Sequence, residues 1–151
     1  MQPGRLAAIC WAFDMASGTY LHNQLTISHD NGHTWSAPID TGIQAESANL
    51  LYLGGERLLS IHSHRGQDVG LHVRVVDLTG DRWATIEEKR IWGAGIGTQT
   101  KDGQSFFEFA GAIRFGQGSL TRLTNGDVLA THWCVVEGQG KILTHRLRLR
   151  D

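Results

Sequence analysis

Short runs of alternating or continuous apolar residues, each bounded by turn residues, make up most of this chain. The runs lie near 5–13, 20–28, 37–42, 48–53, 57–63, 70–78, 87–92, 118–123, 128–136 and 141–149. Gly54-Gly55 and Asn125-Gly126 separate neighbouring runs, and both dipeptides are strong signals for two-residue hairpin turns. The tail 145–150 alternates charged and apolar side chains, which is typical of a half-buried strand. The pattern therefore predicts an all-β chain of short antiparallel strands.

A turn followed by an apolar strand recurs three times, with strands that begin near Leu6, Leu58 and Val128. Leu6 and Leu58 lie 52 residues apart, and Trp35 and Trp83, which each end a turn, lie 48 residues apart. A period of about 40–50 residues with four strands per unit is the signature of β-propeller blades. We therefore predict a β-propeller architecture in which each unit forms one radial sheet.

These units describe one partial propeller over 1–151, with blades at roughly 1–43, 44–92 and 112–151 and a long inter-blade loop at 93–117. The chain then holds about two and a half four-stranded antiparallel blades, whereas a closed propeller has about four to eight. Two interpretations follow. The chain is part of a longer propeller, or several copies associate to close a ring and cover the exposed sheet edges.

One turn carries a specific pattern: the segment 28–35 reads Ser-x-Asp-x-Gly-x-Thr-Trp. Asp30 can accept hydrogen bonds from backbone N–H groups of a tight turn, and Gly32 allows a backbone angle that other residues resist. Thr34 suits the strand that leaves the turn, and Trp35 offers a large apolar surface that pins the hairpin to its neighbours. The segment 77–83 is a degenerate copy.

This pattern resembles the Asp-box, or bacterial neuraminidase repeat, of the sialidase-like β-propellers. The resemblance covers all five fixed positions, Ser28, Asp30, Gly32, Thr34 and Trp35, and implies a structural hairpin on the face opposite the active site. It further implies a fold similar to the C-terminal blades of a six-bladed sialidase propeller. The implied function is a sialidase-like glycoside hydrolase module that acts on or binds glycans. The alternative is a non-catalytic carbohydrate-binding or scaffold propeller with no activity alone.

The enzymes of this resemblance place a tyrosine nucleophile at the start of a strand, in a segment like Tyr-Ser-Ser-Leu. The matching segment here begins Gln117-Gly118-Ser119-Leu120, so a glutamine that cannot ionise stands at the tyrosine position, and the catalytic residues stay unassigned. Gln117 and Ser119 could instead cap a strand, and Arg114 could pair with an acidic substrate or remain a solvated charge. The side chains expected on the loop face opposite the Asp-box are the substrate-binding candidates: Gln117, Ser119, Arg114, His62, His64, Arg65 and Glu46.

His62 and His64 lie two positions apart in a predicted strand, so both side chains point to the same face. This spacing also occurs in metal sites, and His132 or Asp68 could supply a third ligand. The alternatives are that the two imidazoles line a central substrate pocket or are ordinary strand histidines. No metal and no cofactor is predicted.

Composition narrows the function classes. With 151 residues the chain is long enough for one domain with a proper core, and its formal net charge of −1 gives no signal for nucleic acid or an anionic membrane. No apolar run approaches the ~20 residues of a membrane span, and no signal peptide is visible, so we expect a soluble protein, cytoplasmic by default. Cys10 and Cys134 lie in apolar runs, as buried free thiols or as a long-range disulfide. The expected partners are a glycan or small sugar and, in the ring alternative, blades of another chain or a homo-oligomer.

Overall fold

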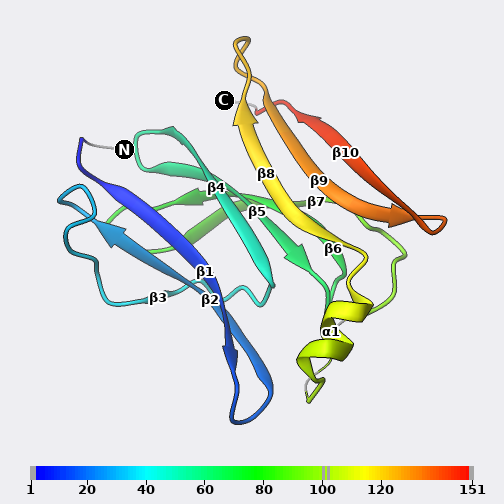
Figure 1. The fold of residues 1–151 in the computed structure, drawn as a ribbon. Helices are drawn as coiled ribbons and strands as arrows, with labels where there is room; N and C mark the ends of the chain where they lie inside the picture. Colours follow the sequence, from blue (N-terminus) through cyan, green and yellow to red (C-terminus); the bar gives the residue numbers. More distant parts are fainter. Residues whose placement is uncertain (1–2, 100, 102, 150–151) are drawn as a thin grey trace.

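The computed structural model describes residues 3–99, 101 and 103–149, and it consists of three antiparallel β-sheets whose strands follow sequence order (Figure 1). The first sheet holds β1 (Leu6–Asp14), β2 (Thr19–Ser28) and β3 (Ile39–Asp40). The second holds β4 (Ser47–Gly54), β5 (Arg57–His64), β6 (Gly70–Asp77) and β7 (Ala84–Trp92). The third holds β8 (Phe115–Arg122), β9 (Val128–Val136) and β10 (Gln139–Leu147). The prediction of an all-β chain is confirmed.

The second sheet lies between the other two, because its first strand, β4, contacts β1 on one side and β8 on the other (Figure 1). Side chains along β5 alternate between these neighbours. Leu59 and Ile61 share a buried cluster with Phe115 of the third sheet, whereas Leu58 shares another with Leu25 of the first. The two faces of the middle sheet are thus covered along β5, and this burial stabilises the stacking of the three sheets.

The outermost strand of the middle sheet differs from the strands inside it. Nearly every residue of β5 and β6 is buried, whereas most of β7 is exposed and carries Glu87, Glu88, Lys89 and Arg90. Charged side chains on an edge strand discourage pairing with another chain. The amino-acid composition of β7 therefore fits a solvated edge.

The Asp30 turn between β2 and β3 is held by side-chain hydrogen bonds. The Asp30 carboxylate accepts from the Thr34 backbone N–H at 2.8 Å, from the Thr34 hydroxyl at 2.6 Å and from the Ser28 hydroxyl at 2.8 Å. These bonds, the Thr34 hydroxyl foremost, lower the pKa of Asp30 to about 2. Gly32 has a φ of 88°, in the left-handed region that favours glycine. Asp30 thus accepts hydrogen bonds within this tight turn, and Gly32 supplies its left-handed backbone angle.

Three details of this turn and the strand after it differ from expectation. Thr34 belongs to the turn rather than to the strand that follows, because its hydroxyl and its N–H are both used on Asp30. The strand predicted at 37–42 is only β3, Ile39–Asp40. Trp35 donates from its indole N–H to the Gly32 carbonyl at 3.1 Å and is still 44% exposed, so it covers its own turn.

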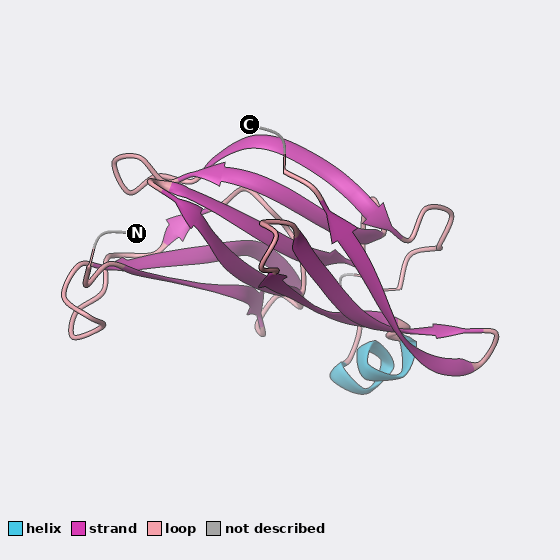
Figure 2. Ribbon diagram, turned by 90° about the horizontal axis from the view of Figure 1, so that it is seen from above, coloured by secondary structure: helices cyan, strands magenta, loops and turns pink. Residues whose placement is uncertain are grey.

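The connection predicted as a loop at 93–117 contains a short helix, α1 (Phe106–Ala112), and β8 already begins at Phe115. A capping box explains the helix start, since the Ser105 hydroxyl accepts from the Glu108 N–H and the Glu108 carboxylate accepts from the Ser105 N–H at 2.9 Å. In Figure 2, α1 lies outside the stacked sheets. The sequence reasoning missed the Ser-x-x-Glu signal that could have found it.

The two cysteines are free, so the disulfide alternative is wrong for the described structure. Cys134 is buried, as expected, in the cluster between the second and third sheets. Cys10 is exposed, because it lies on the face of β1 that points away from the second sheet.

Arg5, just before β1, joins the first sheet to two turns of the second. Its side chain is 6% exposed and binds the Glu56 carboxylate. The guanidinium also donates to the Leu78 carbonyl at 3.0 Å and to Asp81 Oδ1 at 2.8 Å. A buried cation with this many charged and carbonyl acceptors links the two sheets at the turn-bearing end.

We expect Arg5→Met to lower the free energy of unfolding by about 2 kcal/mol. The substitution removes the buried cation, but the partly exposed Glu56 and Asp81 can be rehydrated, which limits the loss. Urea unfolding measures the change, with Arg82→Met, at an exposed arginine nearby, as the control. Equal stability of the two variants would contradict the role of Arg5.

Candidate functional site

The β1–β2 hairpin and α1 lie at the same end of the molecule (Figure 1). A cavity of about 290 Å³ lies among the loops of this end. Its lining comes from the start of β2, the connection between the first two sheets, the β5–β6 loop and the connection before α1: Tyr20, Gln44, Glu46, Gly66, Gln67, Thr98 and Lys101. The volume is at the lower limit for ligand pockets, about 300 Å³, and suits one small polar ligand.

Hydrogen bonds to backbone carbonyls hold the walls of this cavity together. The connection before α1 bonds to the β5–β6 loop through the Thr98 hydroxyl, which donates to the Gly66 carbonyl at 3.0 Å. The same connection bonds to the β1–β2 hairpin through the Gly103 N–H, which donates to the Gly18 carbonyl at 3.0 Å. The long connection therefore forms a wall of the cavity and ties two hairpins from different sheets.

Arg65, which follows β5, is buried beside the cavity-lining Glu46. Its Nη1 lies 3.7 Å from Glu46 Oε2, while Nε and Nη2 donate to the Phe115 carbonyl at 3.1 and 2.8 Å. Burial lowers the pKa of Arg65, and the charge of Glu46 opposes this effect. The pair places one carboxylate at the cavity and fixes its position through the third sheet.

The sequence candidate Gln117 is not among the residues that line the cavity. The pairing of β8 with β9 shifts between Gly116 and Ser119, so Gln117 sits in a bulge, exposed and with a φ of 50°. A Cβ on Gly116 would collide with the Arg65 guanidinium, and a Cβ on Gly118 would come within 2.7 Å of the Ile61 side chain. The two glycines are required by this close approach of β8 to the middle sheet.

Two further candidates, Ser119 and Arg114, are exposed and away from the cavity lining. The Arg114 guanidinium donates to the carbonyls of Gly111 at 2.7 Å and Ile113 at 3.0 Å. Cations near the last carbonyls of a helix are favourable there. The structure thus uses Arg114 to satisfy the C-terminal end of α1.

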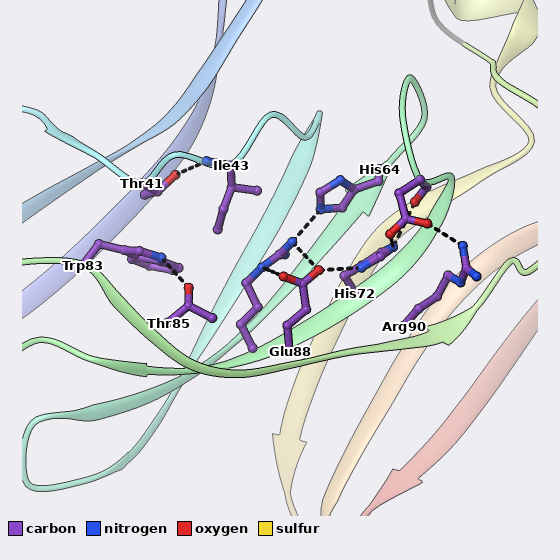
Figure 3. Close-up of polar contacts among 10 residues, drawn as sticks. Thr41, Ile43, His64, His72, Trp83, Thr85, Glu88 and Arg90 are labelled. Carbon is purple, nitrogen blue, oxygen red and sulfur yellow. Dashed lines mark hydrogen bonds and ion pairs between the residues drawn. The ribbon is translucent and has the colours of Figure 1, made fainter.

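The candidate His64 belongs to a polar network on the face of the middle sheet that points to the first sheet (Figure 3). Arg74 donates to His64 Nε2 at 3.1 Å and to the Glu88 carboxylate at 2.7 and 3.0 Å. His72 Nδ1 lies 2.8 Å from the same Glu88 carboxylate. His64 and His72 therefore pack around an ion pair between the buried Arg74 and the partly exposed Glu88, and they do not line the cavity.

His62 is fully buried on the same face, with its ring edge-on to Trp83 at 6.0 Å between ring centroids. Neither ring nitrogen has a hydrogen-bond partner among the described residues. Burial, and then the charge of Arg74, lowers the pKa of His62 well below its usual value and that of His64 to about 3. Both imidazoles are therefore neutral at pH 7.

The metal alternative finds no support in the described part of the chain, where no group of three or more His, Cys, Asp and Glu side chains is arranged to hold a metal ion. His132, suggested as a third ligand, instead faces His145, with 3.1 Å between the Nε2 atoms. Asp68 binds Arg90 at 2.6 Å at the outer edge of the sheet.

Of the seven substrate-binding candidates, only Glu46 lines the cavity, and Arg65 supports it. Sequence reasoning placed the correct loops on this end but did not single out Tyr20, Gln67 or Lys101. No sequence pattern marked Tyr20 as a site residue, because it lies at the beginning of a predicted strand. Only the folded arrangement shows that this strand end opens to the cavity.

The comparisons add no relative. Within the described residues, no helix is long and apolar enough to cross a membrane. Searches with protein-family models, against curated proteins and against solved structures find nothing that matches this chain.

Proposed function

We propose that the three sheets are blades of an incomplete sialidase-like β-propeller, and that the loop-end cavity binds a terminal sugar as part of a glycoside hydrolase module. The fold part of this proposal is supported by the side-by-side stacking of the sheets and by the Asp-box turn held through Asp30. It is also supported by the place of the cavity among the loops at the hairpin end. The single observation that carries the proposed chemistry is that Tyr20 and Glu46 line one sugar-sized cavity.

Tyrosine nucleophiles assisted by a carboxylate are the sialidase exception to two-carboxylate glycoside hydrolysis. Gln117 cannot serve in this role, whereas Tyr20 lines the same cavity as Glu46, the one carboxylate among the described lining residues. In the proposed reaction the phenolic oxygen attacks the anomeric carbon and its proton passes to Glu46. The glycosidic bond breaks, and the leaving alkoxide takes a proton from water, which becomes hydroxide. A second water then attacks the anomeric carbon of the tyrosyl-sugar: its hydroxyl stays on the sugar, its proton neutralises the hydroxide, and the proton on Glu46 returns to the tyrosine oxygen.

The remaining lining side chains suit sugar recognition. Gln44, Gln67 and Thr98 offer donors and acceptors for hydroxyl groups. Lys101 adds one cation, which would attract the carboxylate of an acidic sugar. The three-arginine clamp expected of sialidases is not among the described lining residues, so affinity for an acidic sugar would depend mainly on Lys101.

A non-catalytic glycan-binding propeller is the second candidate, and the glutamine at position 117 favours it, because the expected nucleophile position is not functional. The two candidates share the cavity and differ in turnover. One set of variants therefore tests both.

We expect the protein to bind a fluorogenic sialoside, detected by NMR line broadening of the sugar, and to hydrolyse it. Tyr20→Phe should reduce hydrolysis ~100-fold or more while binding is kept, because only the phenolic oxygen is lost. Gln67→Ala should weaken binding instead, by about tenfold for a lost hydrogen bond to the sugar. Neutral hexosides serve as the comparison for the role of Lys101.

Binding without turnover in the wild-type protein would favour the non-catalytic propeller. Absence of binding by both acidic and neutral sugars would overturn the proposed function. Ser119→Ala, at an exposed residue away from the cavity, is the matched control and should change neither quantity.

A further inference from the structure

The first and third sheets each leave one face uncovered. In the middle sheet, the equivalent face is buried against a neighbouring sheet. In the middle sheet, Leu59 and Ile61 of β5 are buried against the third sheet. In the third sheet, β9 takes the place of β5, since each follows the tight turn of its sheet's first hairpin. The equivalent side chains, Leu129 and Thr131, face away from the middle sheet and are only half-buried.

The uncovered face of the third sheet carries an apolar group, Leu129, Trp133, Val135 and Ile142, among four hydroxyl side chains, Ser119, Thr121, Thr131 and Thr144. Trp133 is paired across the strands with Ile142, which is 71% exposed, although both lie in the interior of their strands. Arg146, paired with Leu129, lies at the margin and is bound to Asp127 at 2.6 Å. A solvated sheet face normally carries polar or charged side chains, as β7 does.

The uncovered face of the first sheet is the complementary one. Ala7 and Ile9 of β1 pack against the middle sheet, so Leu6, Ala8 and Cys10 point the other way. Leu6 is 43% exposed, and Ala8 and Cys10 are also exposed. Gln24 and Thr26 of β2 pair with Cys10 and Ala8 and continue this face. Asp40 of β3 pairs with Gln24, so its contact with His22 at 3.0 Å places one charged group at the margin of the face.

We infer that the uncovered face of the third sheet docks on the uncovered face of the first sheet of a second copy of this chain. The contact continues a packing that the chain already makes twice, from first sheet to second and from second to third. It is head-to-tail, because the two docking faces are different surfaces. The inference rests on the propeller arrangement proposed above.

The number of copies follows from ring closure. One copy supplies three sheets, and closed propellers have about four to eight. One copy is therefore too few and three copies are too many, whereas two copies give a ring of six sheets. Each of the two identical contacts in this ring joins the third sheet of one copy to the first sheet of the other, and no apolar face remains uncovered.

Light scattering on the purified chain tests the inference, and we expect twice the mass of one chain. Ile142→Lys on the third sheet and Ala8→Glu on the first should each give a monomer, because each places a charge in both contacts of the ring. Ile86→Lys is the matched control. Ile86 is 55% exposed on β7, outside both faces, and this variant should stay a dimer. Circular dichroism confirms that each variant is folded.

Mixing the two monomeric variants distinguishes head-to-tail docking from a symmetric contact. In the mixture, the third sheet of the Ala8→Glu chain meets the first sheet of the Ile142→Lys chain, and both faces are unaltered. We therefore expect dimers to return on mixing. A wild-type chain that is monomeric up to its solubility limit, or a mixture that stays monomeric while the wild type is a dimer, would overturn the inference. A monomer that binds sugar would overturn the inferred dimer and support the proposed function. A dimer that binds no sugar would support the inferred dimer and overturn the proposed function.

Discussion

Replacing Gly70 by alanine is expected to lower the free energy of unfolding by about 3–5 kcal/mol, the largest single-residue effect that we predict for this protein. Gly70 opens β6 with a φ of 147°, in the region that L side chains rarely adopt. A Cβ there would collide with the backbone carbonyl of Trp92, which cannot move without unpairing the end of β7. Gly93 leaves equally little room, since a Cβ on it would lie 2.6 Å from the Gly70 Cα.

Substitutions at two other glycines separate the effect of backbone strain from that of the steric collision. Gly42 has a φ of 69° but open space around a Cβ, so Gly42→Ala should cost only the backbone strain, about 1 kcal/mol. Gly140 in β10 has open space and no positive φ, so Gly140→Ala should be nearly neutral. Urea unfolding of the three variants gives the comparison. A Gly70→Ala protein as stable as Gly42→Ala would show that the close approach of β6 and β7 is not required.

The Gly70 substitution should also affect the cavity, because the β5–β6 loop that supplies Gly66 and Gln67 ends at this residue. We therefore expect the folded molecules of the Gly70→Ala variant to bind the sugar more weakly than the wild type. This connects the strained contact at the sheet edge with the position of the proposed site.

Acidification from pH 7 to pH 5 should destabilise the protein strongly, and the buried histidines between the first two sheets are the reason. Burial lowers the pKa of His62 well below its usual value, and that of His64 to about 3. Below about pH 6.5 the unfolded chain binds protons that the folded chain does not, so stability falls as pH falls. Each such histidine contributes a loss of about 1.4 kcal/mol per pH unit, and for His64 the loss continues to about pH 3.

The sign and the window of this effect distinguish it from the titration of carboxylates. The depressed pKa of Asp30, about 2, contributes stability that is lost only as pH falls from about 4 towards 2. A loss between pH 6 and 5 therefore belongs to the histidines, including His132 and His145, whose pKa values burial also lowers.

His62→Leu tests the assignment, because it removes a buried imidazole that makes no hydrogen bond in the described structure. We expect equal or higher stability than the wild type at pH 7, and a shallower loss of stability between pH 6 and 5, measured by urea unfolding. His33→Asn, at an exposed histidine, should keep the wild-type pH dependence. An unchanged pH dependence in His62→Leu would refute the role of the buried histidine.

Local turn chemistry was predictable from the sequence because its partners are close along the chain. Asp30 and Thr34 are four residues apart, and the Gly-Gly and Asn-Gly dipeptides mark hairpins through the backbone angles that they allow. The short helix α1 carried an equally local signal, Ser105 and Glu108, which the emphasis on strands overlooked. The predicted propeller period stays a prediction, supported by the three stacked sheets.

The candidate site was predictable only to the level of loops. Glu46, Tyr20, Gln67 and Lys101 come from four separate segments, and no pattern along the chain relates them. His62 and His64 were correctly placed on one strand face, but alternation alone does not say which neighbouring sheet that face meets. In the folded chain the face meets the first sheet, so these histidines are buried away from the cavity.

By itself the sequence determined the class of the fold, the positions of the hairpin turns and the hydrogen bonds of the Asp30 turn, since each depends on residues a few positions apart. The tertiary structure alone decided which sheet faces are covered, that Arg65 reaches Phe115 and that Tyr20 and Glu46 share a cavity. Those contacts join residues 26 to 50 positions apart in the chain. These residues come together because whole sheets pack on one another. The burial of apolar surface that drives this packing is non-directional, so the sequence does not specify which residues meet.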